Sequence, residues 1–423
     1  MKLKFSLLLL ALVQIGFAQQ RTCGMEQKMQ QIMNDPAARQ QYLQQQAKFE
    51  VELQKLSTLN RNSNTVNNVQ IIRIPVAVHY PSAGAVSESV KTCLRALAQN
   101  QINILNADYN AMNADIVNFT EGDADFYPGI SVGNLGVQFE LATQNHPAGT
   151  GLTNGQVAVT FGTDFLSGAD SDATWAGYMN MVVRNEGNSI LGYSPLGGSP
   201  GAGHTVVINR FCFGSGSGCS GYVPAAPFNL GRTLTHELGH FFNLNHTFNN
   251  GTCSTNTNCN TQGDRVCDTP EVAEESYGCP SVGTVGSCSF EQFALTMNYM
   301  DYVDDACMYM FTLGQENRMR AYYNAIAGQF STTALSNNEV LANSFKVYPN
   351  PSKGSFTIEF KELTNSYSVE VYDITGQVIY DNNFELASSL VQTINLENTS
   401  SGVYFINIKS DNGQLVTKKI VIE

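Results

Sequence analysis

The stretch HELGHFFNLNH, residues 236–246, constrains the fold of this chain more than any other feature. His236 and His240 are four positions apart, so a helix presents both imidazoles on one face. Zinc accepts two imidazoles at that spacing, and Glu237 stands where its carboxylate can act as general base on a metal-activated water. His246 can join the same metal if the chain leaves the helix and turns. The pattern therefore predicts a three-histidine zinc site with Glu237 as its general base.

The turn between His240 and His246 departs from a known pattern. The motif resembles that of the metzincin peptidases, in which a glycine stands where this chain has Asn243. Asparagine enters the left-handed region more readily than other non-glycine residues, so the turn is still expected. The competing interpretation is a core helix with accidental histidines. The chain has only six histidines, however, and three of them fall at ligand spacing beside a glutamate.

A second element, TMNYMDYVDDACM, follows at residues 296–308. Metzincins carry a methionine-containing turn beneath the three histidines, and Met300 is the expected methionine, with Met297 as the competitor. Tyr302 is expected to lean toward the metal and stabilise the oxyanion that forms on the substrate. Taken without the preceding helix, the same residues would be interpreted as a methionine-rich core loop.

Three stretches together are similar to the pappalysin (cytophagalysin-type) family of metzincin metallopeptidases: HELGHFFNLNHTF, GDRVCDTP and NYMDYVDDACMYMFTLGQ. The resemblance covers roughly residues 70 to 328. It implies an α+β zincin domain, in which a twisted mixed sheet carries backing and active-site helices above an irregular, disulfide-tied lower subdomain. It also implies zinc-dependent cleavage of peptide bonds in proteins or peptides.

The resemblance further implies a calcium site in the loop after the zinc motif. The matching oxygen donors are Asp264, the carbonyl of Val266, and Thr269, and such donors suit Ca²⁺. Asp268 lies beside them and is expected either to join the site or only to cap the turn.

A pocket for the residue just after the scissile bond is implied in the same way. In relatives that prefer a basic residue there, an aspartate forms the floor of the pocket, and Asp305 matches its position. Arg or Lys would then be the preferred residue. The alternative is that Asp304 and Asp305 are exposed loop charges.

Ten cysteines in an exported chain predict disulfides. The resemblance implies the pairs Cys259–Cys288 and Cys279–Cys307. Proximity alone suggests Cys253–Cys267 and Cys212–Cys219. Cys93 lies on the apolar face of a predicted helix and is expected to be a buried free thiol.

The first residues read as a secretory signal peptide over residues 1–18, with Lys2 and Lys4 before a short apolar run. Residues 19–68 are expected to form a helical, polar pro-segment. Its Cys23, in RTCGM, has no expected partner, so its thiolate can fill the open zinc position and keep the precursor latent. Related precursors carry a similar Arg-x-Cys-Gly element. A Cys23–Cys93 disulfide is the alternative, and a self-cut before Arg61 is the expected activation step.

The C-terminal part is predicted to hold a polar linker over residues 329–344 and a small antiparallel β-sandwich over residues 345–423. The stretches VYPNPSKG, VYDITGQVIY and GVYFINI resemble the sorting domain of type IX secretion. Export would run through the periplasm and across the outer membrane by that secretion machinery, with release or attachment at the cell surface. A carbohydrate-binding or adhesive β-module is the alternative for this domain.

Composition narrows the partners of the protein. The formal charge of −13 argues against nucleic acid or an anionic membrane as partner, and no stretch after the signal is apolar enough to span a membrane. The leading interpretation is a secreted zinc metalloendopeptidase made as a latent precursor. The alternatives are a surface adhesin or binding protein with a non-catalytic zinc site, and a zinc hydrolase that acts on non-peptide amide bonds.

Overall fold

The structure is a computed structural model that describes most of the chain. The described residues are 20–62, 72–162, 165, 169–187, 190–248, 253, 258–289, 292–335, 345–360, 367–373, 376–384, 391–396, 399–410 and 415–423. The chain divides into two compact units, residues 1–334 and residues 335–423. The expected signal peptide, residues 1–18, lies outside the described residues.

A six-stranded sheet forms the centre of the first unit. Its main path runs β2-β1-β4-β6-β5, and β3 pairs with the far end of β1. The strands are β1 (Ile72–Tyr80), β2 (Val137–Leu141), β3 (Val159–Phe161), β4 (Met179–Arg184), β5 (Gly192–Tyr193) and β6 (Thr205–Asn209). All pairings are parallel except that of β5 with β6. The predicted mixed sheet is confirmed, and its one antiparallel strand, β5, forms an edge.

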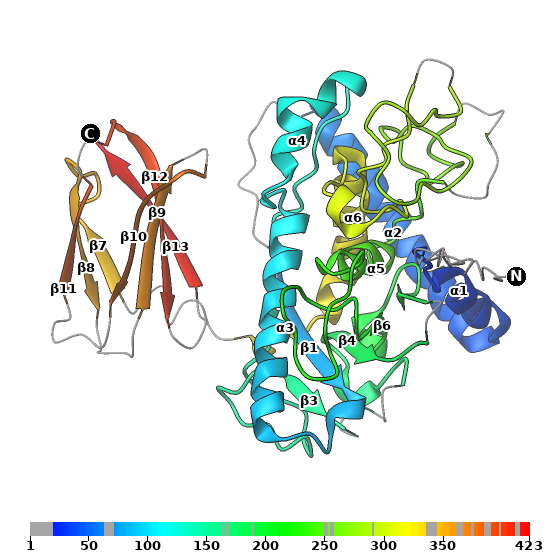
Figure 1. The fold of residues 1–423 in the computed structure, drawn as a ribbon, viewed down its shortest axis with the longest axis horizontal. Helices are drawn as coiled ribbons and strands as arrows, with labels where there is room; N and C mark the ends of the chain where they lie inside the picture. Colours follow the sequence, from blue (N-terminus) through cyan, green and yellow to red (C-terminus); the bar gives the residue numbers. More distant parts are fainter. Residues whose placement is uncertain are drawn as a thin grey trace, which may run out of the picture. The chain divides into compact units, whose positions relative to one another are not determined.

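Three helices share the main core with this sheet, α3 (Glu88–Tyr109), α5 (Arg232–Phe241) and α6 (Leu313–Ile326), and α5 carries the zinc motif (Figure 1). The short helix α4 (Ile116–Glu121) belongs to a separate cluster through Phe119. One face of α3 buries Leu94, Ile102 and Leu105 in the main core, which explains its helical spacing of apolar residues. The hydroxyl of Tyr109 donates to the carbonyl of Thr235 at 3.0 Å, which ties α3 to the zinc-motif helix α5.

The N-terminal segment is helical, as expected, and belongs to the first unit. Helix α1 spans Met25–Asn34 and helix α2 spans Pro36–Asn62. Phe49 of α2 has no exposed surface and is a member of the main core. The expected cut before Arg61 falls in the last turn of α2, directly before a stretch outside the described residues.

The region after α5 has little regular structure, as the resemblance implies, and disulfides tie it together. The pair Cys279–Cys307 is present as expected. Two other pairings differ from the expectation: Cys259 binds Cys267, and Cys288 binds Cys253. The chain between Cys259 and Cys267 folds back on itself through backbone bonds from Thr261 and Gln262 to the carbonyl of Asn258. This turn brings Cys267 to Cys259, and Cys288 is left facing Cys253.

The expectations for Cys93 and Cys212 are wrong. Cys93 is joined to Cys219 across 126 positions of sequence, which also excludes a bond between Cys93 and Cys23. Cys219 lies in a tight turn, where it pairs with Tyr222, and this turn faces the side of α3 that carries Cys93. Cys212 is the buried free thiol instead.

Residues 329–334 of the predicted linker belong to the first unit. Ala327–Gln329 and Thr332–Ala334 form short 3-10 helices, and Phe330 and Ala334 are buried. The carbonyl of Ala334 accepts hydrogen bonds from the backbone of Thr143 and Gln144. These residues therefore complete the first unit, while residues 336–344 lie outside the described part.

The second unit is the expected antiparallel β-sandwich. One sheet has the order β10-β9-β12-β13 and the other β11-β8-β7. The strands are β7 (Phe345–Tyr348), β8 (Ser355–Phe360), β9 (Tyr367–Asp373), β10 (Val378–Phe384), β11 (Val391–Asn395), β12 (Gly402–Ser410) and β13 (Leu415–Ile422). Apolar residues from both sheets, such as Phe356, Ile358, Val369 and Ile406, form one core. Among the described helices of the whole chain, none is both long and apolar enough to cross a membrane.

Candidate active site

Helix α5 and the turn after it bring three histidines together. The Nε2 atoms of His236 and His240 lie 3.2 Å apart, and those of His240 and His246 lie 3.0 Å apart. Asn243 makes the turn between them with φ of 71°, as expected for its position. Its backbone N–H donates to the carbonyl of His240 at 2.8 Å, which closes the helix and returns the chain toward His246.

Backbone carbonyls orient two of these imidazoles. Nδ1 of His236 lies 2.7 Å from the carbonyl of Tyr299, and Nδ1 of His240 lies 2.7 Å from that of Leu244. A carbonyl can only accept a hydrogen bond, so Nδ1 carries the proton and each Nε2 is left with its lone pair toward the centre. Burial lowers the pKa of His240 to about 4 and holds the pKa values of His236 and His246 well below their usual range. The three side chains are therefore neutral nitrogen donors.

Cys23 supplies a fourth donor atom. Its Sγ and one nitrogen from each of the three histidines all lie within 4.8 Å of one another. Three imidazoles and one thiolate around a common centre are a donor set that fits zinc. The backbone holds Cys23 there: the N–H of Gly24 donates to the carbonyl of Gly192 at 2.9 Å, and Leu191 donates to Thr22 at 3.0 Å. The pro-segment thus lies parallel to the edge strand β5.

Glu237 and Tyr302 flank this centre. Glu237 is 1% exposed, and its Oε2 accepts from the thiol of Cys23 at 3.3 Å. Burial raises the pKa of Glu237 to about 8. The hydroxyl of Tyr302 accepts from the backbone N–H of Cys23 at 3.3 Å, and its ring lies 5.0 Å from that of His246. Both side chains therefore contact the segment that occupies the centre.

Met300, rather than Met297, lies beneath the zinc helix. A Cβ atom at Gly239 of α5 would approach the sulfur of Met300 to 2.4 Å, so the glycine is needed for this close packing. Met297 belongs to a separate cluster with Phe119 and Tyr127.

Asp305 is buried, and an arginine of the pro-segment occupies its site. Nη2 of Arg21 lies 2.6 Å from Oδ1 of Asp305, and both side chains are at most 1% exposed. Arg21 also donates to the carbonyl of Val303 and to Thr233, and its guanidinium lies 5.0 Å from the ring centre of Phe228. Asp305 is therefore not an exposed loop charge.

The proposed calcium donors lie together. Oδ2 of Asp264 accepts from the hydroxyl of Thr269 at 2.7 Å, and the same hydroxyl donates to the carbonyl of Val266 at 2.9 Å. Asp268 points elsewhere, because its two carboxylate oxygens accept from Thr312 and from the backbone of Gly314 at the start of α6. It caps α6 and does not join the other three residues.

Sequence reasoning missed a second anchor of the pro-segment, on α2. The side-chain amides of Gln46 and Asn243 exchange two hydrogen bonds, of 3.1 and 3.0 Å. One turn later, Phe49 packs against Tyr322 and lies under the guanidinium of Arg318, which is 4.8 Å from its ring centre. Arg318 in turn donates to the carbonyl of Asn243. A phenylalanine in a polar, glutamine-rich helix was the available signal.

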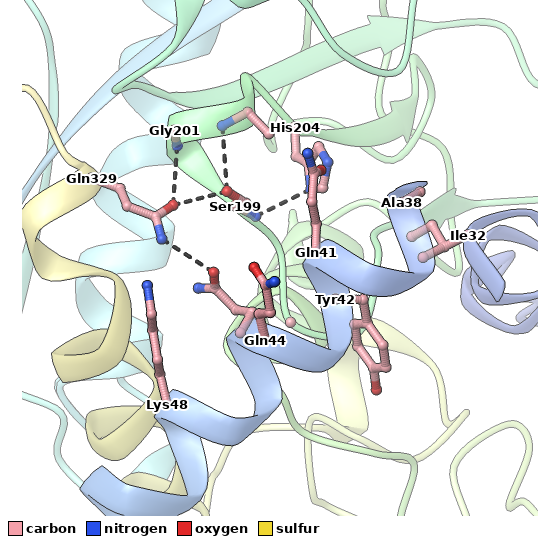
Figure 2. A pocket seen from close by; sticks show the side chains of 13 residues that line it. Ile32, Ala38, Gln41, Tyr42, Gln44, Lys48, Ser199, Gly201, His204 and Gln329 are labelled. Carbon is pink, nitrogen blue, oxygen red and sulfur yellow. Dashed lines mark hydrogen bonds between the residues drawn. The ribbon is translucent and has the colours of Figure 1, made fainter. Parts of the chain in front are cut away.

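The rest of the α2 interface is more open. A cavity of about 380 Å³ lies between α2 and the loop that holds Ser199 and His204 (Figure 2). Figure 2 shows Oε1 of Gln329 accepting from Ser199. Gln329 bridges the two sides, since its Nε2 also donates to Gln45 of α2. α2 is buried most deeply at Phe49, and Leu53 and Leu56 pack partly buried against the same core.

The fold and the site define a metzincin-type zincin domain, with a histidine triad, a glutamate, and a methionine beneath them. Residues 221–324 match the family model described as pregnancy-associated plasma protein-A, and residues 346–423 match the secretion system C-terminal sorting domain. Residues 221–324 are thus similar to the pappalysin family. The second unit is a type IX sorting domain, and the protein is secreted.

Relatives of known class agree with this assignment. The chain is 38% identical over 148 residues to extracellular metalloprotease 1 of Coccidioides posadasii, across 34% of this chain and 49% of that protein. An extracellular metalloprotease of Verticillium alfalfae is 48% identical over 100 residues, across 23% of this chain and 33% of that protein. The chain thus spans half or less of the length of these relatives. A promirolysin variant of Tannerella forsythia is 28% identical, with a TM-score of 0.53, and the match covers 75% of this chain and 100% of that structure.

Proposed function

We propose that this protein is a secreted zinc metalloendopeptidase made as a latent precursor. The observation that carries the proposal is the convergence of Cys23 with His236, His240 and His246, directly beside Glu237. Glu237 stands beside the fourth donor position, where a general base can reach the attacking water.

The three histidines would hold zinc, which when bound activates water and polarises the scissile carbonyl. Glu237 would take the proton of the attacking water and pass it to the leaving amine. Its raised pKa suits such a base, because the carboxylate has to accept and then release a proton. The hydroxyl of Tyr302 is placed to donate to the oxygen of the tetrahedral intermediate. Met300 would support the histidines from below.

Latency would depend on Cys23. Burial raises the pKa of this thiol in the protein alone, but a bound zinc ion deprotonates a coordinating thiol. The thiolate would then occupy the position that the attacking water needs. Residues 19–68 would form the pro-segment, and activation would remove them after a cut near Arg61.

The preference for Arg or Lys after the scissile bond is supported by Arg21. Its guanidinium already lies in the site that Asp305 closes, and a substrate side chain of the same chemistry could replace it there. The carboxylate is also held in place, since its Oδ2 accepts from the backbone N–H of Leu230 at 2.8 Å.

Calcium is proposed as a second metal, bound by Asp264, the carbonyl of Val266 and Thr269. The hydroxyl of Thr269 is already within hydrogen-bond distance of the other two oxygens. Burial raises the pKa of Asp264 to about 7, and a cation would stabilise its charged form.

The test is casein digestion by protein from which the pro-segment has been removed. Digestion should stop with a zinc chelator and return with added zinc. Glu237→Ala should retain zinc and lose about 10²–10⁴-fold in kcat/KM. Glu121→Ala, at the exposed end of α4, is the matched control and should keep full activity. An activated protein that binds zinc and cuts no protein or peptide would contradict the proposal and favour a binding protein.

A further inference from the structure

A second cation of the pro-segment is held by an acid of the catalytic domain. Nζ of Lys28, on α1, donates to Oδ2 of Asp170 at 2.8 Å. The two side chains are 19% and 31% exposed, so the pair lies at a rim that solvent reaches. This pair and the Arg21–Asp305 pair both join a basic side chain of the pro-segment to an aspartate of the catalytic domain.

Residues of the catalytic domain also hold the carboxylate of Asp170 in place. Oδ1 of Asp170 accepts from the hydroxyl of Tyr193 at 2.8 Å and from Nη2 of Arg184 at 3.1 Å. Arg184 is shared, because its Nε also pairs with Glu186. Among the described residues, Lys28 is the only side-chain partner that Oδ2 has. Removing the pro-segment would therefore leave the carboxylates of Asp170 and Glu186 to share the guanidinium of Arg184. Oδ2 of Asp170 would then be free to bind another cation.

The surroundings of this acid are hollow. A cavity of about 180 Å³ lies beside Asp170, lined among others by Gly24, Gln27, Lys28, Glu186 and Tyr193. Pro-segment residues form one wall of the cavity. Their departure would open it on the side that the pro-segment now covers.

The backbone pairing along β5 places this site relative to the zinc centre. Thr22 pairs with Leu191, and Gly24 follows along the strand toward Tyr193. Arg21 thus lies beyond the Leu191 end of β5, whereas Lys28 and Asp170 lie at the Tyr193 end. The two aspartates are on opposite sides of Cys23. An extended substrate that adds to the edge strand β5 would pass both of them.

We propose that Asp170, held by Tyr193 and Arg184, is a second specificity site of the mature enzyme. It binds a Lys or Arg side chain on the N-terminal side of the scissile bond, opposite to the site of Asp305. The pro-segment fills both sites at once, with Lys28 and Arg21. This inference rests on the proposed peptidase activity and adds a second basic position to its substrates.

The first test is a peptide library cleaved by the mature enzyme. The library should select a basic residue at one position on the N-terminal side of the scissile bond. Peptides with Lys at that position should exceed matched Gln peptides about two- to fivefold in kcat/KM, as expected for a partly exposed ion pair. Asp170→Asn should abolish this difference and keep the preference after the scissile bond. Glu121→Gln controls for the loss of one surface charge and should change neither preference.

A second test leaves the enzyme unaltered, so that a folding defect of the Asp170 variant cannot decide the result. A synthetic peptide of residues 20–34 is measured as inhibitor of the mature enzyme, and Lys28→Gln should weaken it about two- to fivefold. The proposal is overturned if mature enzyme cuts peptides without basic enrichment before the scissile bond, or if Lys28→Gln inhibits equally. An enzyme that cuts no peptide at all would contradict the proposed function instead.

Discussion

The guanidinium of Arg21 and the carboxylate of Asp305 form an ion pair of 2.6 Å that is closed to solvent. The two residues lie 284 positions apart, one before the catalytic domain and one in its irregular lower region. Both partners of a pair buried this deeply have to be present, because a single unpaired charge in the same place would destabilise the protein. On the proposed function, the pro-segment therefore protects the pocket as well as blocking the zinc centre.

Asp305→Asn in the mature enzyme should remove the preference for Arg and Lys after the scissile bond. An amide can still accept from the backbone of Leu230, so the pocket keeps its shape and loses only its charge. The loss for Arg substrates should be about 10²–10³-fold in kcat/KM, in line with breaking a buried pair. Peptide profiling checks this, with Asp304→Asn as control. An unchanged basic preference would exclude Asp305 as the pocket floor.

Cys23→Ala should produce a precursor that digests casein without prior activation, because nothing then blocks the attacking water. Cys212→Ala, at the other free cysteine, should stay latent. The measurement is casein digestion by freshly purified precursor. A parallel sample that also carries Glu237→Ala is purified without self-digestion. Equal latency of both cysteine variants would mean that Cys23 does not act as the switch.

Phe49→Ala should weaken the grip of the pro-segment on the catalytic domain. The side chain is fully buried, and its truncation should cost about 3–5 kcal/mol of interaction. After a cut behind α2, the separated pro-segment should leave the catalytic domain faster, as measured by recovery of activity after dilution. Gln46→Ala should act in the same direction with a smaller effect, whereas the exposed Leu43→Ala should not. If Phe49→Ala left the release rate unchanged, α2 would not be an anchor.

Calcium should stabilise the mature enzyme. At about a hundredfold excess over its Kd, a ligand adds about 2.7 kcal/mol, which corresponds to a rise in Tm on the order of 5–10 °C. Asp264→Asn should abolish the rise, and Asp268→Asn should lower Tm but keep the response, because Asp268 caps α6. Calorimetry with and without a calcium chelator distinguishes these results. A Tm that does not change with calcium would contradict the proposed calcium site.

The chemistry of the site could be predicted from sequence because it lies in short, local patterns. The spacing of His236 and His240 on a helix, and the tolerance of asparagine for positive φ at residue 243, are local properties of the chain. The apolar spacing of α3 is likewise local, since its buried Leu94, Ile102 and Leu105 recur on one helical face. Short strands such as β3 and β5 were not, since two or three residues carry no periodicity.

Pairings across long stretches of sequence could not be predicted. Proximity in sequence suggested Cys212 as partner of Cys219, but the turn at Tyr222 directs Cys219 to Cys93 on α3. For the same reason Asp170 carried no signal, because its role depends on Tyr193 and on a lysine that lies 142 positions earlier. Asn243 combines a local and a long-range property. Its positive φ could be predicted from the sequence, whereas its pairing with Gln46 could not.

The central claim is that one zinc ion in the precursor is bound by Cys23 and three histidines, and that loss of the sulfur ligand turns on proteolysis. Zinc K-edge absorption spectroscopy of the precursor and of the activated enzyme tests it most directly. The precursor should show one sulfur at about 2.3 Å and nitrogen ligands at about 2.0 Å, and activation should remove the sulfur as casein digestion begins. A precursor whose zinc has no sulfur ligand, or an activated enzyme that keeps it, would contradict the account.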